Sequence, residues 1–328
     1  MAEFNVLKMN FLSPLHIGQG VTESYGRSGR ILHSDSLSGA LAAVYSVQNP
    51  AEDVKLFMEN YKISSAYPFI HEGLFFQKPM IKLPFSATGE SPNLTKRIKS
   101  LEYFDKESFE SILIGKELNL DRNHFAGNGK YYLSSGSSDF ISSFSSEVVQ
   151  RVAVPRGEGG DAFPFYFERL SFNKECGFWF FYEVSSEYKN RFLESMILLG
   201  ENGIGTDRTV GNGQFTISLE TIDVKLPVSN KNRLLISLFC PTEPDTKNYH
   251  PDNSSYLLIK RGGFIAGSSD VTHRHLRKKS IYMFLEGSVF DSHIEGKIEN
   301  LRPEWNDVNL HPVWRDGRAF SLPIIINT

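Results

Sequence analysis

Alternating apolar and polar residues predict a strand after residue 214. Phe215, Ile217 and Leu219 alternate there with polar side chains, a period of two that is typical of a half-buried strand. Further apolar stretches predict strands over residues 4–11, 165–172 and 177–184, of which the last two form a β-hairpin.

Apolar residues at helical spacing predict two helices. Leu37 and Leu41 mark the buried face of the first helix, and Ser34 or Asp35 can cap its N-terminus. The second helix is predicted over residues 187–199.

The order of these elements is strand, helix, long insertion, two strands, helix and strand. This βαββαβ order predicts an α+β fold in which residues 1–226 form a ferredoxin-like domain, as in RNA-recognition domains. The insertion, about residues 50–163, shows no sizeable run of core pattern. Residues 227–328 predict a smaller, β-rich domain, and because helices are scarce there, a second ferredoxin-like unit would be a degenerate one. Within this domain Asp316-Gly317 predicts a hairpin turn.

A glycine-rich loop joins the second helix to the last strand, with the sequence Gly203-Ile204-Gly205-Thr206-Asp207-Arg208-Thr209-Val210-Gly211-Asn212-Gly213. Glycine allows positive φ angles and a close approach of the backbone to a ligand. A cationic side chain, Arg208, among exposed amides suits a phosphate. The loop lacks the lysine of a P-loop, and it runs from helix to strand, the reverse of a dinucleotide-binding fingerprint. A glycine-rich turn without a ligand is the alternative.

The predicted topology gathers several loops into one corner. In a ferredoxin-like sheet the last strand runs antiparallel beside the first, so the end of the first strand meets the glycine loop. The N-terminus of the first helix adds a preference for anions. The candidate RNA-binding residues of this corner are His16, Gly18, Gly20, Arg27, His33, Ser34, Gly203, Gly205, Arg208, Gly211 and Gly213.

Two further groups of basic residues are candidates for RNA contacts. Arg151 and Arg156 flank a Val-Ala-Val run, where solvated strand ends are an equally open interpretation. The net charge of −3 excludes a generic polyanion binder, so any nucleic-acid site must be a local basic surface. The densest basic cluster, in the second domain, contributes Lys260, Arg261, Arg277, Lys278 and Lys279.

Composition excludes several other classes of protein. The 328 residues include only two cysteines, Cys176 and Cys240, without a CxxC motif, which excludes a disulfide framework and a cysteine zinc site. No signal peptide and no apolar run of membrane-spanning length is visible, so a cytoplasmic protein without membrane contact is expected. His273 and His275 lack a further well-spaced ligand, and neither a metal nor a cofactor is expected.

The glycine loop and its setting resemble a known superfamily. A Gly-x-Gly-x5-Gly-x-Gly loop between helix and strand is similar to that of the RAMP superfamily, the repeat-associated proteins of CRISPR systems. Residues 13–18 and 32–41 resemble the opening of the type III-A Csm-complex subunits that bind the 5′ end of the guide RNA. Residues 260–264, 285–290 and 311–315 resemble the C-terminal half of those subunits. The resemblance covers most of the chain except about residues 85–148.

The resemblance implies a non-catalytic, RNA-binding structural subunit that acts in antiviral defence. Such subunits hold the repeat-derived 5′ handle of the crRNA. They contact two partners, the large polymerase-like or cyclase-like subunit and the backbone RAMP subunit. They also carry a hairpin-like projection near the backbone subunit, which the insertion could supply.

Two other functions stay open. RAMP relatives that process guide RNA use a histidine as general acid or base, so His16 or His33 could serve a metal-independent crRNA-processing endoribonuclease. No second acid–base partner accompanies these histidines at a telling spacing. The other alternative is a protein-interaction scaffold whose glycine loop only packs and makes no direct contact with RNA.

Overall fold

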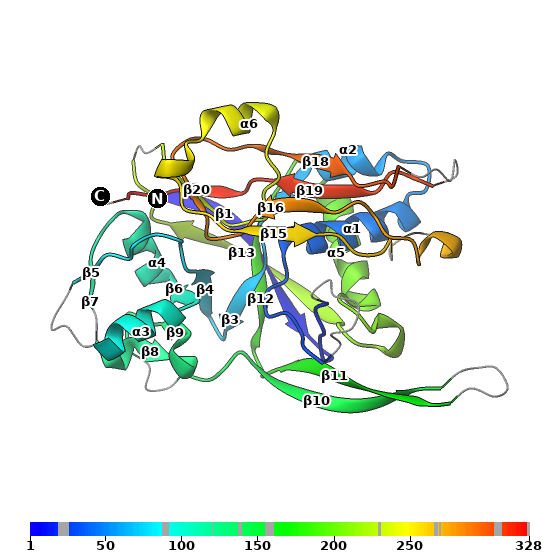
Figure 1. The fold of residues 1–328 in the computed structure, drawn as a ribbon, viewed down its shortest axis with the longest axis horizontal. Coiled ribbons are helices and arrows are strands. Elements are labelled where there is room, and N and C mark those ends of the chain that lie inside the picture. Colours follow the sequence, from blue (N-terminus) through cyan, green and yellow to red (C-terminus); the bar gives the residue numbers. More distant parts are fainter. Residues whose placement is uncertain are drawn as a thin grey trace.

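The computed structural model describes residues 1–18, 26–86, 92–119, 121–136, 140–154, 161–228, 231–265, 268, 270–304 and 310–326. These residues form a mixed α+β protein built on one large sheet and several smaller ones, as the predicted α+β class requires. The large sheet has nine strands in the order β13-β1-β12-β3-β4-β6-β9-β8, with β2 also paired to β12. In Figure 1 the C-terminal elements, yellow to red, lie above this sheet.

The first and last strands of the N-terminal part lie side by side. β1 (Ala2–Phe11) pairs antiparallel with β13 (Phe215–Val224) over its whole length, so that Phe11 lies opposite Phe215. The predicted meeting of the end of the first strand with the start of the last is confirmed. On its other side β1 pairs with β12 (Cys176–Val184), which is followed by β2 (Tyr61–Ile63) and β3 (Tyr67–Ile70).

Both faces of the sheet around β12 are covered. On one face α1 (Ser34–Gln48) and α5 (Lys189–Asn202) pack together, and Phe180 of β12 belongs to the same hydrophobic core. On the other face Phe181 stacks on Phe320 from the C-terminal part, with ring centroids 5.7 Å apart. The aromatic run of β12 is therefore structural, and its rings are not exposed for stacking on bases.

The predicted hairpin of residues 165–172 and 177–184 is wrong. β11 (Phe163–Phe172) pairs instead with β10 (Phe144–Ala153), from Phe144 opposite Phe172 to Ala153 opposite Phe163. Together they form the β10–β11 ribbon, which projects from the body at the bottom of Figure 1. β12 is buried through most of its length, so core packing, and not the short connection from β11, sets its neighbours.

The residues predicted as an insertion without a core contribute much of the large sheet. Phe76, Phe104 and Phe109 are buried among them. The strands concerned hold only two to five residues each, too few to show a period. The elements of this stretch are α2 (Val54–Glu59), β4 (Gly73–Gln77), β5 (Phe85–Ser86), α3 (Pro92–Ser100), β6 (Tyr103–Asp105), α4 (Lys106–Leu113), β7 (Leu118–Asn119), β8 (Phe125–Ala126) and β9 (Tyr131–Tyr132).

The described C-terminal residues form three small sheets, of strand order β17-β14-β20, β15-β16 and β18-β19. Their elements are β14 (Arg233–Leu235), α6 (Glu243–Asn248), β15 (Leu258–Arg261), β16 (Ile281–Phe284), β17 (Val289–Phe290), β18 (Gly296–Asn300), β19 (Trp314–Arg318) and β20 (Ser321–Pro323).

The hairpin turn predicted at Asp316-Gly317 is also wrong. Both residues lie inside β19, where Asp316 pairs with Ile298 and Gly317 with Lys297. The glycine is needed for close packing, because an added Cβ would overlap the side chain of Cys240. Glycine inside a strand marks such an approach as readily as it marks a turn.

Candidate nucleic-acid interface

Three of the four loop glycines allow backbone segments to pack against each other. Gly203, Gly205 and Gly213 have φ angles of 78°, 90° and 75°. A Cβ at these positions would overlap the carbonyl oxygens of Asn212, His16 and Ile204, respectively. Only glycine fits such positions without strain. Gly211 differs, because it is exposed and an added Cβ there would meet nothing within 4 Å.

Several amides of the loop donate hydrogen bonds within the chain. The Ile204 N–H donates to the Gly213 carbonyl (2.9 Å), the Thr206 N–H to the His16 carbonyl (3.0 Å) and the Gly213 N–H to the Pro14 carbonyl (2.8 Å). These bonds fix the base of the loop against residues 14–16. The part left at the surface is the short turn Arg208–Val210 with Gly211.

Arg208 is exposed at the end of this framework. Its neighbour Asp207 does not pair with it, because the Asp207 carboxylate is held by Arg151 of β10 and by the Asn212 amide (3.0 Å). No ion pair joins the Arg208 guanidinium to any residue that the structure describes. The loop thus presents one exposed cation on a rigid base.

Arg151, predicted to reach RNA from a strand edge, makes two contacts within the chain. It pairs with Asp207, and its guanidinium lies 4.7 Å from the centroid of the Phe167 ring. Its partner in the prediction, Arg156, lies outside the described residues, as does Gly20.

His16 lies beside the glycine loop, as the topology predicted, but its ring is not open to solvent. The side chain is only 2% exposed, Nδ1 lies 2.6 Å from the Glu168 carbonyl oxygen, and the ring stacks on Phe167. Gly18 is exposed next to Thr206 of the loop, and Arg27 is exposed after it.

The N-terminus of α1 is closed by the C-terminal part, so it offers no open anion site. The Ser34 hydroxyl accepts a hydrogen bond from the Leu238 N–H (2.9 Å), and the Ser34 N–H donates to Ser65 (2.9 Å). Asp35 is fully buried and is bound by the guanidinium groups of Arg261 (2.8 Å) and Arg315. The two arginines hold the pKa of Asp35 well below its usual range, against the effect of burial.

His33 joins the same buried contact between the two parts. Its Nδ1 lies 2.7 Å from Oε1 of Glu286, a carboxylate that also accepts a hydrogen bond from Ser65. Burial alone would lower the pKa of His33, but the Glu286 carboxylate outweighs this and raises the pKa. We call the residues Asp35, Arg261, Arg315, His33 and Glu286 the buried charge cluster.

The other basic residues of the C-terminal cluster have different surroundings. Lys260 is exposed on β15, and the Arg277 guanidinium lies 5.2 Å from the Phe264 ring centroid. Lys278 is half-buried, and burial together with Arg315 lowers its pKa to about 7. Lys279 pairs with Glu304 at 2.9 Å. Arg315 was missed by the sequence reasoning, because no local pattern distinguishes it from any other arginine.

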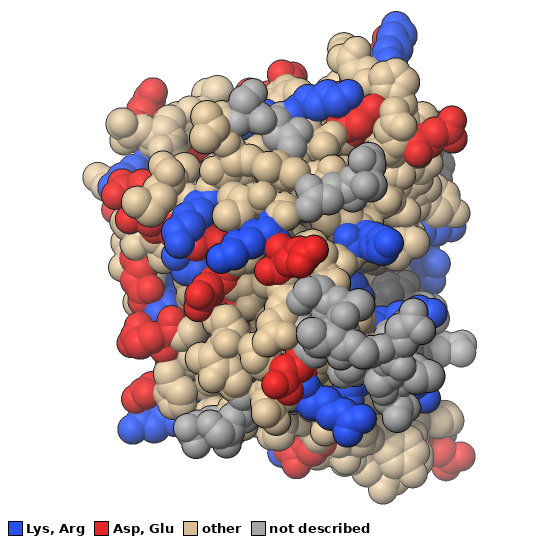
Figure 2. Space-filling model, turned by 90° about the vertical axis from the view of Figure 1, so that its left-hand side faces the viewer, with Lys and Arg blue, Asp and Glu red and all other residues tan. Residues whose placement is uncertain are grey.

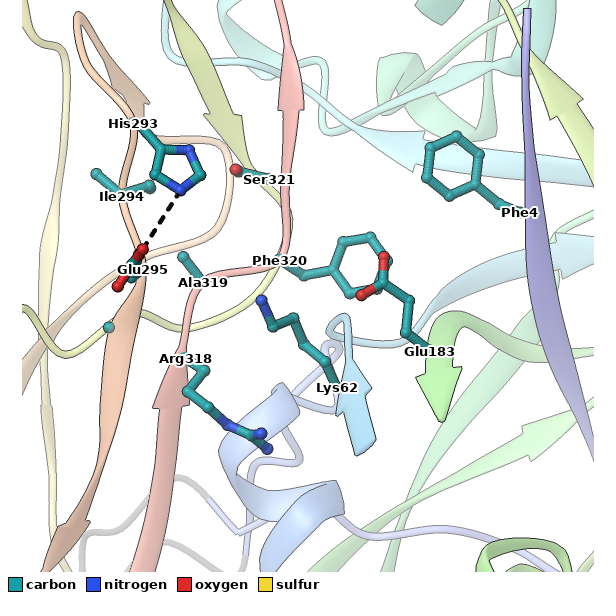
Figure 3. Close-up of a pocket in the computed structure, with 11 residues that line it drawn as sticks. Phe4, Lys62, Glu183, His293, Ile294, Glu295, Arg318, Ala319, Phe320 and Ser321 are labelled. Atoms are coloured by element: carbon teal, nitrogen blue, oxygen red, sulfur yellow. Dashed lines mark ion pairs between the residues drawn. The ribbon is translucent and has the colours of Figure 1, made fainter. Parts of the chain in front are cut away.

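A cavity of about 480 Å³ lies between the large sheet and the C-terminal strands. Figure 3 shows Phe4 and Glu183 on the sheet side and His293 and Glu295 on the opposite side, with Phe320 between them. Acidic and basic side chains both line it, so the cavity shows no preference for a phosphate. It contains none of the predicted site residues.

The face of the molecule that carries the two termini has both positive and negative side chains. Figure 2 shows lysines and arginines interspersed there with acidic residues and no continuous basic surface. Among the residues that the structure describes, no group of three or more His, Cys, Asp or Glu side chains could hold a metal ion. None of the described helices is both long enough and apolar enough to cross a membrane.

Comparison with known proteins gives one consistent family. Residues 229–324 match the family described as the CRISPR Csm4 C-terminal domain. The CRISPR system Cms protein Csm4 of Mycobacterium tuberculosis strain H37Rv is 30% identical over 153 residues, which is 46% of this chain and 49% of that protein. The chain thus matches about half the length of this relative. The protein of the same description from Thermococcus onnurineus is 22% identical over 77% of this chain and 78% of its own length.

Solved structures agree in fold along the whole chain. A crystal structure of a Csm3–Csm4 subcomplex matches with a TM-score of 0.65 and 20% identity, covering 99% of this chain and 100% of the other. A Csm1–Csm4 cassette in complex with cA4 matches with a TM-score of 0.63 and 17% identity over the full length of both chains. The resemblance predicted from the sequence is confirmed.

Proposed function

We propose that this chain, a Csm4-family subunit of a type III-A CRISPR complex and a member of the RAMP superfamily, holds the repeat-derived 5′ handle of the crRNA without cleaving it. The observation that carries this proposal is the exposed Arg208, presented by a loop whose base is packed and hydrogen-bonded within the chain. A loop whose backbone is fixed before binding loses little conformational freedom when a phosphate arrives.

The fold suits this function. The sheet order β13-β1-β12-β2, with α1 and α5 on one face, supports a ferredoxin-like interpretation of the N-terminal domain. The three small sheets of the C-terminal part support a degenerate second unit. On this interpretation the glycine loop lies between the second helix and the last strand of the first unit, where the RAMP resemblance expects it.

Two protein partners belong to the proposal. By analogy with the related Csm1–Csm4 and Csm3–Csm4 structures, this chain links a large polymerase-like subunit to the backbone RAMP filament. The β10–β11 ribbon supports a docking role, because Val148, Val152, Phe163 and Tyr166 are 57%, 54%, 65% and 64% exposed on it. Apolar groups held out on a two-stranded ribbon are typical of an interaction site.

The surroundings of the two candidate histidines favour a structural role over catalysis. The ring of His16 is buried against Phe167 and Glu168, and that of His33 is bound to Glu286. A general acid or base must reach the proton that it transfers, either directly or through one water. We therefore rank the crRNA-processing endoribonuclease below the non-catalytic RNA-binding subunit as a candidate function.

The test is RNA binding and cleavage by the full chain assembled with its partners. Radiolabelled repeat-derived 5′-handle RNA is bound on filters at several salt concentrations. We expect Arg208→Ala to weaken binding about 5- to 150-fold, the effect of losing a hydrogen bond to a charged group. Affinity should also fall steeply with salt. Lys247→Ala, an exposed lysine on α6, is the matched control and should bind as the unmodified chain does.

Two results would overturn the proposal. Cleavage of the RNA without added metal, abolished by His16→Ala or His33→Ala, would show an endoribonuclease. Equal RNA retention by complexes with and without this chain, with the partners still assembled, would show a scaffold that does not touch RNA.

A further inference from the structure

The outer face of β15 and β16 combines exposed aromatic rings with basic side chains. Lys260 of β15 lies opposite Tyr282 of β16, and Tyr282 is 64% exposed. The pairing continues past the strands, where Phe264 forms a bridge with Arg277. The Phe264 ring is 42% exposed, and the Arg277 guanidinium lies 5.2 Å from its centroid. Two aromatic rings on one ribbon are thus each accompanied by a cation.

The charge of this ribbon is one-sided. Residues 258–264 and 277–284 contain five lysines and arginines and no acidic residue, although the chain as a whole carries a net charge of −3. Acidic side chains reach the ribbon only from other segments. Asp35 of α1 binds Arg261, and Glu304 pairs with Lys279. Among the described residues, no ion pair joins Lys260, Arg277 or Lys278 to a carboxylate.

Positive charge also exceeds negative charge beneath the ribbon. Asp35 is shared by Arg261 and Arg315, and the field of Arg315 reaches Lys278 beside them. Burial and this field lower the pKa of Lys278 to about 7, so its ammonium form is held at a cost in free energy. An anion on the outer face, above this excess of positive charge, would relieve part of that cost. A phosphodiester is such an anion.

We infer that the outer face of the β15–β16 ribbon binds single-stranded RNA, with one base stacked on Tyr282 and a second on the Phe264–Arg277 pair. Aromatic rings and guanidinium planes are the groups on which proteins stack unpaired bases, and lysines beside them neutralise the phosphates. Phe264 lies four positions after Lys260, which is opposite Tyr282, a chain span of at most roughly 13 Å, so the two rings address different nucleotides.

This inference rests on the proposed function, and it divides the basic cluster into two roles. Arg261 and Arg315 are positioning residues, because Asp35 already binds them. Lys260 and Arg277, which are exposed, contact RNA, together with two aromatic residues that the charge pattern alone did not single out. A protein partner is the competing occupant, since Leu257 and Leu258 are also exposed nearby, 58% and 53%.

The test uses the full chain in its complex and a 5′-handle RNA carrying 5-iodouridine at successive positions. We expect irradiation to cross-link Tyr282 to one nucleotide. Tyr282→Ala should weaken binding about 5- to 150-fold, as expected for one lost stacking contact, while Tyr282→Phe should restore it. Lys260→Gln should lower the salt slope of log affinity by about 0.7, as for one phosphate of a single strand. Leu257→Ala is the control and should leave RNA binding unchanged.

The outcomes separate this inference from the function on which it rests. If the unmodified chain binds RNA and Tyr282→Ala binds equally well, the stacking surface is wrong and the proposed function stands. If Tyr282→Ala and Leu257→Ala both release a protein partner while RNA stays bound, the surface is a protein interface and the inference is overturned. If the unmodified chain contributes nothing to RNA binding, both proposals fail. A thermal melt of each variant checks folding first.

Discussion

Arg151 of the β10–β11 ribbon forms an ion pair with Asp207 of the glycine loop. The contact joins two segments that lie 56 residues apart in the sequence. The guanidinium also covers the Phe167 ring of the neighbouring strand, and Phe167 in turn stacks on His16. The root of the projecting ribbon, the glycine loop and the end of the first strand are therefore one packed unit. The ion pair thus connects the ribbon to the loop that presents Arg208.

A double-mutant cycle on Arg151→Ala and Asp207→Asn tests this connection. Asparagine suits position 207, where φ is 68°, so the substitution removes the charge and spares the backbone. Because both side chains are partly exposed, we expect a coupling free energy of about 1 kcal/mol in urea unfolding. Hydrogen exchange should speed up in β10 and β11 in each single variant. A coupling of zero would show that the pair does not hold the ribbon.

Asp35→Asn should be far more damaging than the loss of any surface carboxylate. The change leaves Arg261 and Arg315 buried without their shared counter-charge. Breaking a buried ion pair by removing one partner costs about 3–5 kcal/mol, and we expect a loss of that size in the free energy of unfolding. Glu201→Gln, an exposed site on α5, is the control and should change stability by less than about 0.5 kcal/mol. Similar unfolding curves for the two variants would show that the buried charge cluster around Asp35 does not stabilise the fold.

The loop and strand patterns were predictable because their signals are local. The alternation after residue 214 predicted β13, and the glycine spacing predicted the loop before it. The predicted strand order placed His16 beside this loop, where the His16 carbonyl does lie against Gly205. The partners of charged residues were not predictable in this way. Arg261, predicted as an RNA contact, binds Asp35, which lies 226 residues away in the sequence. The helix N-terminus at Ser34, predicted to be open to anions, is covered by Leu238, whose N–H donates to the Ser34 hydroxyl. The short strands of the insertion were not predicted, because two to five residues are too few to show the alternation of a strand.

Gly213→Ala and Gly211→Ala form a matched pair that separates backbone packing from backbone strain. Both residues have positive φ, 75° and 83°, so both substitutions incur about 1–2 kcal/mol of strain. At position 213 the new methyl group would also overlap the Ile204 carbonyl, whereas at position 211 it meets nothing within 4 Å. We expect a loss of about 4 kcal/mol or more for Gly213→Ala in urea unfolding. Equal losses at both positions would show that the loop is not packed as described.

The His33–Glu286 contact should make stability depend on pH in a defined direction. The pKa of His33 is raised above its usual 6.5 in the folded chain, so the contact stabilises the fold fully below pH 6.5. That contribution is lost as pH rises through the raised pKa, at about 1.4 kcal/mol for each unit by which the folded pKa exceeds the unfolded one. The pKa of Glu286 is lowered from 4.5, so Glu286 titrates at lower pH and does not interfere.

The measurement is the difference in unfolding free energy between the unmodified chain and His33→Gln from pH 6 to pH 9. We expect this difference to be largest at pH 6 and to shrink as pH rises. Lys278, whose pKa is lowered to about 7, titrates in the same range, but it is present in both proteins and cancels in the difference. A difference that stays constant, or grows with pH, would mean that His33 is not charged against Glu286 in the folded chain.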